Sequence, residues 1–217
     1  MSEKIRGSVD IPLNDTGKKH AKDGAKWLKR NCKVKFVQPS SLDRTIETAF
    51  IVSDVTGAKV LEPSEKLDPW HLGKFEGQES NKVRSQLEEY VRNPDEKVPG
   101  KIKGATHDGE SFGSFRRRTI PFIKQLIDKY GQDECSLVIV THYRDIHLIR
   151  SWCACGCPSD LSIDTEMMLK KYGEPGEIYH LTGTSKKCKI VDIDTSQDQK
   201  LGPGIIVMRH GDTDWNG

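Results

Sequence analysis

The segment GIIVMRHGDTDWNG, residues 204–217, decides how the rest of the chain is interpreted. It opens with an uninterrupted apolar run, which is typical of a strand buried in the middle of a sheet. Arg209 and His210 follow directly, at the carboxyl end of that strand. The stretch before it, TSQDQKLGPG (195–204), is small and polar and ends in Gly-Pro-Gly, which is the composition of a linker. The sequence therefore predicts a central strand that comes last, behind a linker.

Outward from this segment, predicted strands and helices alternate along the chain. Asn14 is the expected N-cap of the first helix, and a Ser cap is expected to open the second. Helices are predicted at 14–30, 40–55, 80–92 and 109–131 and from 143 onward, and strands at 33–38, 59–63, 135–142, 177–183 and 187–193. This alternation predicts an α/β fold of three layers, α/β/α, with a mostly parallel central sheet. We find no internal repeat and expect one domain over residues 1–217.

Composition excludes several classes of protein. The 217 residues include 34 basic and 32 acidic side chains, and the net charge of +2 argues against a general nucleic-acid clamp. No apolar run is long enough to span a bilayer, and residues 1–14 lack the apolar core of a signal peptide. We therefore expect a cytoplasmic protein with no nucleic-acid or membrane partner. Its oligomeric state cannot be read from the sequence.

The six cysteines are expected to be reduced thiols. The run WCACGC (152–157) is the one that suggests a metal site. Its C-x-C-x-C spacing is not a common zinc pattern, and no fourth ligand is obvious in the sequence. Free thiols are therefore favoured there, and no metal is expected.

Three predicted strands end in side chains that suit phosphate chemistry. The strand at 204–209 leads to Arg209 and His210, the strand at 135–141 leads to His142, and the strand at 33–38 leads to Arg44 in the following helix. In an open α/β sheet, ligands bind beyond the carboxyl ends of the strands. A single histidine or arginine in such a place is more often structural. Together, two guanidinium groups beside two imidazoles suit a phosphoryl group.

At this point the sequence resembles the histidine phosphatase (phosphoglycerate mutase-like) superfamily. The Arg-His-Gly signature with its x-Thr-x-Trp-Asn continuation is the most specific match. Further segments resemble the family at similar spacing: GSVDIPLNDTGKKHA, PSSLDRTIETA, LDPWHLGKFEG, DGESF and VTHYRDI. The resemblance covers nearly the whole chain and implies a phosphoglycerate mutase-like fold.

The order of these segments differs from the family's order. In the family the Arg-His-Gly strand comes first, whereas here it comes last, and residue 1 resumes where residue 217 ends. We interpret the chain as a circular permutant in which 195–204 joins the original termini and 205–217 is the original first strand with its catalytic loop. The sequence does not say whether the permutation is natural or engineered.

The resemblance also implies roles for individual residues. His210 would be the nucleophile that forms a phosphohistidine, and Arg209, Arg44 and His142 would hold the phosphoryl oxygens. Asn216 and the backbone of Arg6 and Gly7 would contact the bound phosphate, and Glu110 would also belong to the substrate-binding residues. No cofactor and no metal are implied.

The general acid is where the sequence departs from the family pattern. Many members have Glu at the position that Pro69 occupies here. Asp68, next to it, is the first candidate for protonating the leaving oxygen, and Glu110 is the second. His71 and Asp145 rank behind these two.

Three functions are consistent with this sequence. The leading interpretation is a metal-independent phosphomonoesterase acting on a small phosphorylated substrate. A cofactor-dependent phosphoglycerate mutase would use the same histidine and arginine set, but the chain is somewhat short for that branch. An inactive phosphate-binding or scaffold protein is the third interpretation, motivated by Pro69. The physiological substrate cannot be identified from the sequence.

Overall fold

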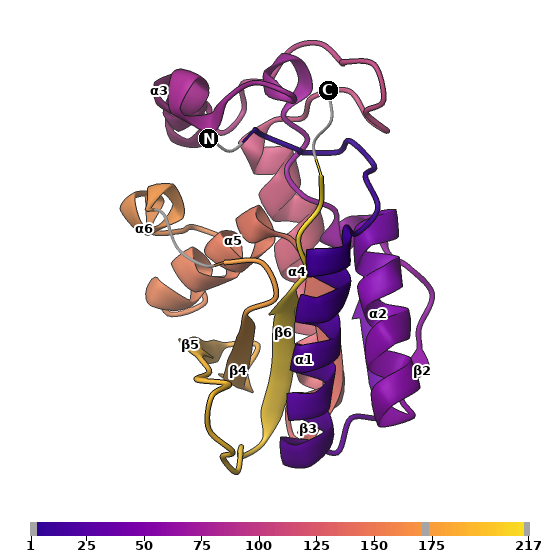
Figure 1. The fold of residues 1–217 in the computed structure, drawn as a ribbon. Helices are drawn as coiled ribbons and strands as arrows, with labels where there is room; N and C mark the ends of the chain where they lie inside the picture. Colours follow the sequence, from indigo (N-terminus) through magenta and orange to yellow (C-terminus); the bar gives the residue numbers. More distant parts are fainter. Residues whose placement is uncertain (1–3, 171–173, 215–217) are drawn as a thin grey trace.

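The computed structural model describes residues 4–170 and 174–214, which build a six-stranded sheet with helices on both faces (Figure 1). The strands lie in the order β2-β1-β3-β6-β4-β5. Their bounds are β1 Phe36–Pro39, β2 Lys59–Val60, β3 Glu134–Thr141, β4 Ile178–Thr184, β5 Lys187–Asp192 and β6 Gly204–Arg209. The last strand in the chain, β6, is therefore an interior strand of the sheet, as the sequence predicted.

The sheet is mixed, which corrects the prediction of a mostly parallel sheet. Strands β2, β1, β3 and β6 are parallel, whereas β4 is antiparallel to both β6 and β5. After α5 (Tyr143–Ala154), the chain returns to the carboxyl end of β6, where the N–H of Gly176 donates to the carbonyl of His210 at 3.2 Å. Strand β4 starts from that edge, so it runs opposite to β6, and β5 follows as a hairpin.

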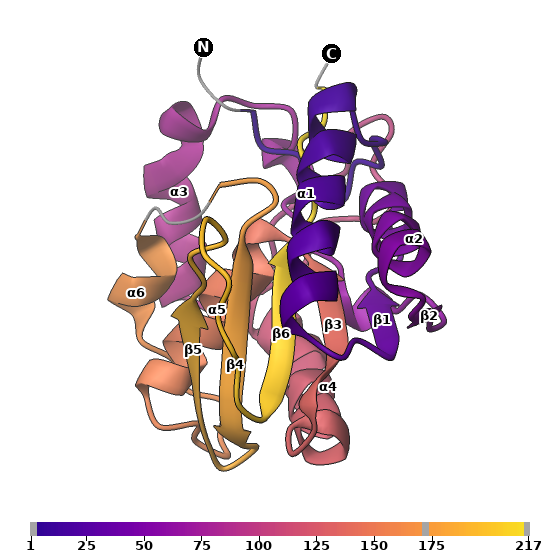
Figure 2. The ribbon, with the colours of Figure 1, turned by 60° about the horizontal axis from the view of Figure 1, so that its bottom comes forward.

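Helices cover the sheet in two layers (Figure 2). Helices α1 and α2 pack on one face, and α4 and α5 pack on the other. The helices are α1 Asp15–Asn31, α2 Asp43–Thr56, α3 Ser80–Arg92, α4 Phe112–Tyr130, α5 Tyr143–Ala154 and α6 Thr165–Leu169, with short 3₁₀ turns at Glu65–Leu67 and Gly73–Phe75. The three-layer architecture was correctly predicted.

The apolar runs of the central strands explain why both faces are covered. Successive side chains of a strand point to opposite faces. In β3, Leu137 and Ile139 join the hydrophobic cluster under α4 and α5, whereas Val138 and Val140 join the cluster under α1 and α2. Strand β6 divides its side chains between the same two clusters. A strand buried on both faces needs no polar alternation, which accounts for the unbroken apolar pattern.

One of the two predicted helix caps is present. The side chain of Asn14 accepts a hydrogen bond from the N–H of Gly17 at 2.7 Å and caps α1. The expected Ser cap on the second helix is wrong, since α2 begins at Asp43 and has no side-chain cap. The hydroxyl of Ser40 is instead hydrogen-bonded to His142 and Thr45.

The segment that was predicted as a linker runs along the C-terminal part of α1. The indole N–H of Trp27 donates to the carbonyl of Gln197 at 2.9 Å, and Asn31 and Arg30 bind Asp198. This path leads the chain from β5 to the start of β6. Within 4–170 and 174–214, none of the helices combines the length and apolar character that a bilayer crossing requires.

Candidate active site

Two histidines meet where β3 and β6 end. His210 follows β6 directly, and its N–H donates to the carbonyl of Thr141 at 3.1 Å, so the two strand ends are held in register. His142 follows β3 and is the N-cap residue of α5. The rings lie 5.1 Å apart, edge to face, and the residues are only 5% and 3% exposed. The predicted convergence of these imidazoles is therefore observed.

The hydrogen bonding of His210 fixes its tautomer. Its Nδ1 lies 2.6 Å from the carbonyl oxygen of Gly211. A carbonyl oxygen only accepts, so Nδ1 must carry the proton. In the neutral ring the lone pair is then on Nε2, which makes this atom the nucleophilic end of the side chain.

His142 is held by Ser40, which the sequence suggested only as a helix cap. The hydroxyl of Ser40 lies 2.7 Å from Nε2 of His142 and 2.8 Å from the hydroxyl of Thr45. Ser40 stands between β1 and α2, so it ties the ring to the neighbouring loop. The Nδ1 atom of His142 has no hydrogen-bond partner among the described residues.

Both imidazoles are neutral at neutral pH. Burial, followed by the positive charge of Arg44, holds the pKa of His210 well below its ordinary value. The same causes in the same order lower the pKa of His142. A neutral imidazole is the form that can attack phosphorus.

Arg44 is buried beside the histidines at 1% exposure. Its guanidinium donates to the carbonyls of Val9 at 2.8 Å and Gly7 at 2.9 Å, while its Nε has no partner among the described residues. Burial lowers its pKa to about 10, so the group is still charged at neutral pH. Arg209 lies 5.2 Å from the ring centre of Tyr143. These two guanidinium groups give the site its positive charge.

The N-terminal segment closes one side of the site. Arg6 donates to the carbonyl of Thr213 at 3.1 Å and pairs with Asp212 at 3.5 Å. The neighbouring Ser8 binds the buried carboxylate of Glu76 through its N–H and its hydroxyl. Gly7 has φ +49°, and a Cβ there would lie 2.2 Å from that carboxylate, so the position requires glycine.

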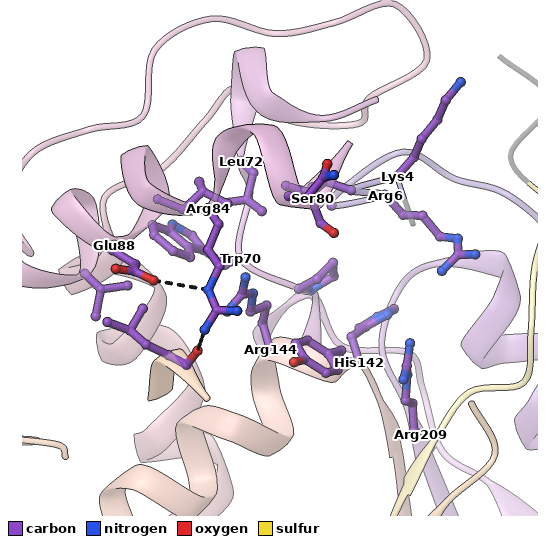
Figure 3. A pocket seen from close by; sticks show the side chains of 18 of the residues that line it. Lys4, Arg6, Trp70, Leu72, Ser80, Arg84, Glu88, His142, Arg144 and Arg209 are labelled. Carbon is purple, nitrogen blue, oxygen red and sulfur yellow. Dashed lines mark hydrogen bonds and ion pairs between the residues drawn. The ribbon is translucent and has the colours of Figure 1, made fainter. Parts of the chain in front are cut away.

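These groups line a cavity of about 430 Å³ (Figure 3). In the figure, His142 and Arg209 mark one end of the cavity, with Arg6 beside them, whereas Arg84 and Glu88 of α3 mark the other. Apolar side chains form much of the wall between the ends: Ile5, Pro69, Trp70, Leu72, Leu87, Val91 and Leu169. The arrangement fits a phosphate at the histidine end and a small organic group beneath α3.

None of the four acid candidates, Asp68, Glu110, His71 and Asp145, lines this cavity. The Asp68 carboxylate is fully buried and accepts hydrogen bonds from the N–H and the hydroxyl of Ser41, at 2.8 and 2.6 Å. Glu110 forms a two-point ion pair with Arg118, at 2.6 and 3.2 Å. Arg118 also binds the carbonyls of Asp68 and Pro69 and so fixes the whole loop. Asn216 lies outside the described residues.

One group near the site has the composition of a metal site. Ligand atoms of Asp68, His71 and His107 lie within 4.8 Å of one another. Each Asp68 oxygen accepts a hydrogen bond from Ser41, and the Arg118 guanidinium lies 2.7 Å from the Asp68 carbonyl oxygen. A positive charge in that position opposes cation binding, so this group is poorly suited to hold a metal.

Sequence reasoning missed two residues that shape the site. Ser40 holds His142, and Glu76 holds the Gly7–Ser8 backbone. Glu76 belongs to the segment LDPWHLGKFEG. A glutamate in a loop is usually exposed, so the sequence did not predict that its carboxylate is buried. Its role follows only from contacts between segments far apart in the chain.

The sequence is similar to those of known proteins. A sequence profile described as the histidine phosphatase superfamily (branch 1) matches residues 1–193. Phosphoglycerate mutase-like protein 4 of Arabidopsis thaliana is 31% identical over 144 residues, which is 64% of this chain and 59% of that protein. The chain thus matches less than two thirds of the length of this relative.

Two of the similar solved structures are described as phosphatases. A putative alpha-ribazole-5'-P phosphatase from Escherichia coli aligns with a TM-score of 0.65 at 18% identity, over 90% of each chain. A mycobacterial glucosyl-3-phosphoglycerate phosphatase in complex with inorganic phosphate aligns with a TM-score of 0.62 at 18% identity, over 91% of this chain and 93% of that one. At this identity, the likeness establishes a common fold.

The buried histidines predict a loss of stability in acid. Their folded-state pKa values lie below the unfolded value of about 6.5, so below that pH the unfolded chain binds more protons than the folded one. The free energy of unfolding then falls by up to about 1.4 kcal/mol per pH unit for each histidine. Urea unfolding of the wild type and of His142→Gln, at about pH 7.5 and about pH 5.5, should show a smaller loss in the variant.

The interval from about pH 7.5 to about pH 8.5 is the control, since neither histidine changes charge there and the two slopes should agree. Equal losses of stability between about pH 7.5 and about pH 5.5 in both proteins would contradict the assignment of a neutral, buried His142.

Proposed function

The chain belongs to the histidine phosphatase superfamily, branch 1, and from this membership we propose that it is a metal-independent phosphomonoesterase acting through a phosphohistidine. The observation that carries the proposal is the buried His210, whose Nδ1 is bound to the Gly211 carbonyl and whose Nε2 is left as the nucleophile. Arg44 and Arg209 supply positive charge beside it. A neutral nucleophile among fixed cations suits attack on a phosphate dianion.

The reaction consists of two displacements at phosphorus. In the first, Nε2 of His210 attacks, the N–P bond forms, and the P–O bond to the leaving group breaks. In the second, water attacks the phosphohistidine, and inorganic phosphate and the free imidazole are released. Arg44, Arg209 and His142 hold the equatorial oxygens, so that positioning and electrostatics lower the barrier of both steps.

The cavity supports a small phosphorylated substrate. Its volume of about 430 Å³ lies in the usual range for small-molecule sites. The apolar wall of Trp70, Leu87 and Val91 suits a carbon skeleton, and Arg84 of α3 stands at the far end. The E. coli and mycobacterial proteins of similar fold are titled as phosphatases of phosphorylated metabolites, which is consistent with this substrate class.

Phosphoryl transfer to a second acceptor is the alternative, and it shares the first step with hydrolysis. The Arabidopsis relative is named phosphoglycerate mutase-like, which is consistent with phosphoryl transfer. An aryl phosphate assay and a glycerate phosphate assay, both in the presence of a chelator, distinguish the two. Release of phosphate supports hydrolysis, and movement of phosphate between glycerate positions supports transfer.

Replacing the nucleophile provides the first test. We predict that His210→Ala lowers kcat for an aryl phosphate by about 10³-fold or more, because the variant lacks the nitrogen that forms the covalent intermediate. Phosphate release over time, measured with a chelator present, checks this. His20→Ala, a half-buried histidine of α1 that does not line the cavity, is the matched control and should retain its activity. Near-normal turnover by the folded His210→Ala variant would refute the scheme.

We still propose Asp68 as the general acid. In the described structure its carboxylate is buried and accepts a hydrogen bond from the hydroxyl of Ser41. A general acid matters in proportion to the basicity of the leaving group, since a poor leaving group must be protonated as it departs. The hydrogen bond from the Ser41 hydroxyl to Asp68 connects the carboxyl to the loop that faces the site.

The choice of substrate makes this assignment testable. We predict that Asp68→Asn slows hydrolysis of an alkyl phosphate by about 10²-fold or more, but changes hydrolysis of an activated aryl phosphate far less. Glu110→Gln is the matched comparison. If Glu110→Gln shows this selective loss and Asp68→Asn does not, Glu110 is the acid. Equal losses on both substrates in Asp68→Asn would show a structural role.

We also propose that the order of segments is a circular permutation of the family's order. The family profile matches residues 1–193, so β6 and His210 lie outside the match, yet β6 pairs with β3 and β4 inside the sheet. The loop after β6 contacts the N-terminal segment through Arg6 and Thr213. Joining that loop to that segment would restore the order strand, catalytic loop, α1.

A rearranged chain tests this proposal. Residue 217 is joined to residue 1, and the chain is opened within 195–203. We predict the same fold by circular dichroism, a similar kcat and a lower KM, because Arg6 and the loop after His210 would be tethered together. An unfolded product would contradict the permutation, and unchanged kinetic constants would contradict the idea that the present order loosens substrate binding.

A further inference from the structure

Three cysteine sulfurs meet at the end of α5 that is remote from His142. Cys153 lies in the last turn of α5, Cys157 in the turn that follows, and Cys188 on the edge strand β5. The sulfur of Cys188 lies 3.0 Å from that of Cys153 and 3.0 Å from that of Cys157, and all three lie within 4.8 Å of one another. Cys188 is more than 30 residues from WCACGC in the sequence, and only the fold brings it to these cysteines.

From this convergence we propose that Cys153, Cys157 and Cys188 form a zinc site with three thiolate ligands. Thiolates bind zinc about 2.3 Å from the ion, which in a tetrahedron places the sulfurs about 3.8 Å apart. Sulfurs that already lie 3.0 Å apart in two pairs need to open by less than about 1 Å to accept the ion. A set of soft thiolates selects zinc over magnesium or calcium.

The backbone around Cys157 is shaped to turn its sulfur back toward Cys188. Gly156 and Cys157 both have left-handed φ angles, of 78° and 61°. This conformation is uncommon for a residue with a side chain and persists where surrounding contacts hold it. The N–H of Cys188 donates to the Cys157 sulfur at 3.1 Å. Hydrogen bonds of this kind stabilise a sulfur that carries negative charge.

The electrostatics of the helix end also favour a cation. The C-terminus of a helix carries partial negative charge from its unpaired carbonyls. The last turn of α5 holds no basic side chain.

A disulfide explains the cluster less well. Cys188 is close to two sulfurs at once, so a bond to either would leave the third thiol unused in the same pocket. Cys157 and Cys188 are 5% and 7% exposed, whereas Cys153 is partly exposed, which leaves room for water as the fourth ligand.

The site would have a structural role. It would fasten the C-terminal end of α5 to the edge strand β5, which pairs with β4 in the described sheet. The 12 residues of α5 separate this end from His142 by about 18 Å. Zinc at this position would thus stabilise the fold without taking part in phosphate chemistry, and the proposal does not depend on the proposed function.

Metal analysis of the whole chain tests the proposal. The protein is purified without chelator or added metal and dialysed, and zinc per chain is measured by mass spectrometry of the elements. We expect about one zinc per chain in the wild type and at least a tenfold lower content in Cys188→Ser. Cys155→Ser, an exposed cysteine in the same turn but outside the cluster, is the matched control and should keep its zinc.

A second measurement covers the case in which Cys188→Ser folds poorly. Wild-type protein stripped of metal is titrated with Co²⁺, and three-thiolate binding should give strong sulfur-to-cobalt charge-transfer absorption with one ion per chain. Chelator should lower the Tm of the wild type but not of Cys153→Ser. Metal-free wild type that shows no cobalt absorption would overturn the proposal. An intact mass showing a disulfide at Cys188 in freshly purified protein would also overturn it.

Discussion

The burial of cationic and imidazole groups at one edge of the sheet is the constraint on which the rest of this structure depends. Arg44, His142 and His210 are almost completely buried, and the carboxylates of Asp10, Asp68 and Glu76 only partly offset the effect of burial on the guanidinium. Burying a charge is costly, and like charges repel. The structure meets this constraint by keeping both imidazoles neutral and by giving Arg44 the carbonyls of Val9 and Gly7.

The surrounding loops hold Arg44 and the two histidines in this arrangement. The Gly7–Val9 backbone must stay in place for its carbonyls to solvate Arg44, and the buried Glu76 carboxylate holds it there through Ser8. Ser40 holds His142, and the Gly211 carbonyl sets the tautomer of His210. A preorganised pocket of positive charge stabilises a phosphoryl group without reorganising during the reaction, which is the physical basis for the proposed phosphatase activity.

Local patterns in the sequence predicted much of the fold and the centre of the site. The apolar runs before His142 and His210 identified two strands buried on both faces, and the rule for ligands at strand ends brought Arg44, His142 and His210 together. What depends on contacts between distant segments was not predictable. The antiparallel β4, the burial of Asp68 behind Ser41, the role of Glu76 and the approach of Cys188 to the α5 cysteines are all of this kind.

The central claim is that Nε2 of His210 becomes phosphorylated during turnover. The direct measurement is rapid quenching of the enzyme with a phosphorylated substrate in alkali, where phosphohistidine survives, followed by peptide mass spectrometry. We expect one phosphoryl group per chain at His210, formed at a rate compatible with kcat and absent from His210→Ala. Turnover with no phosphorylated histidine, or with the phosphoryl group on another residue such as His142, would contradict it.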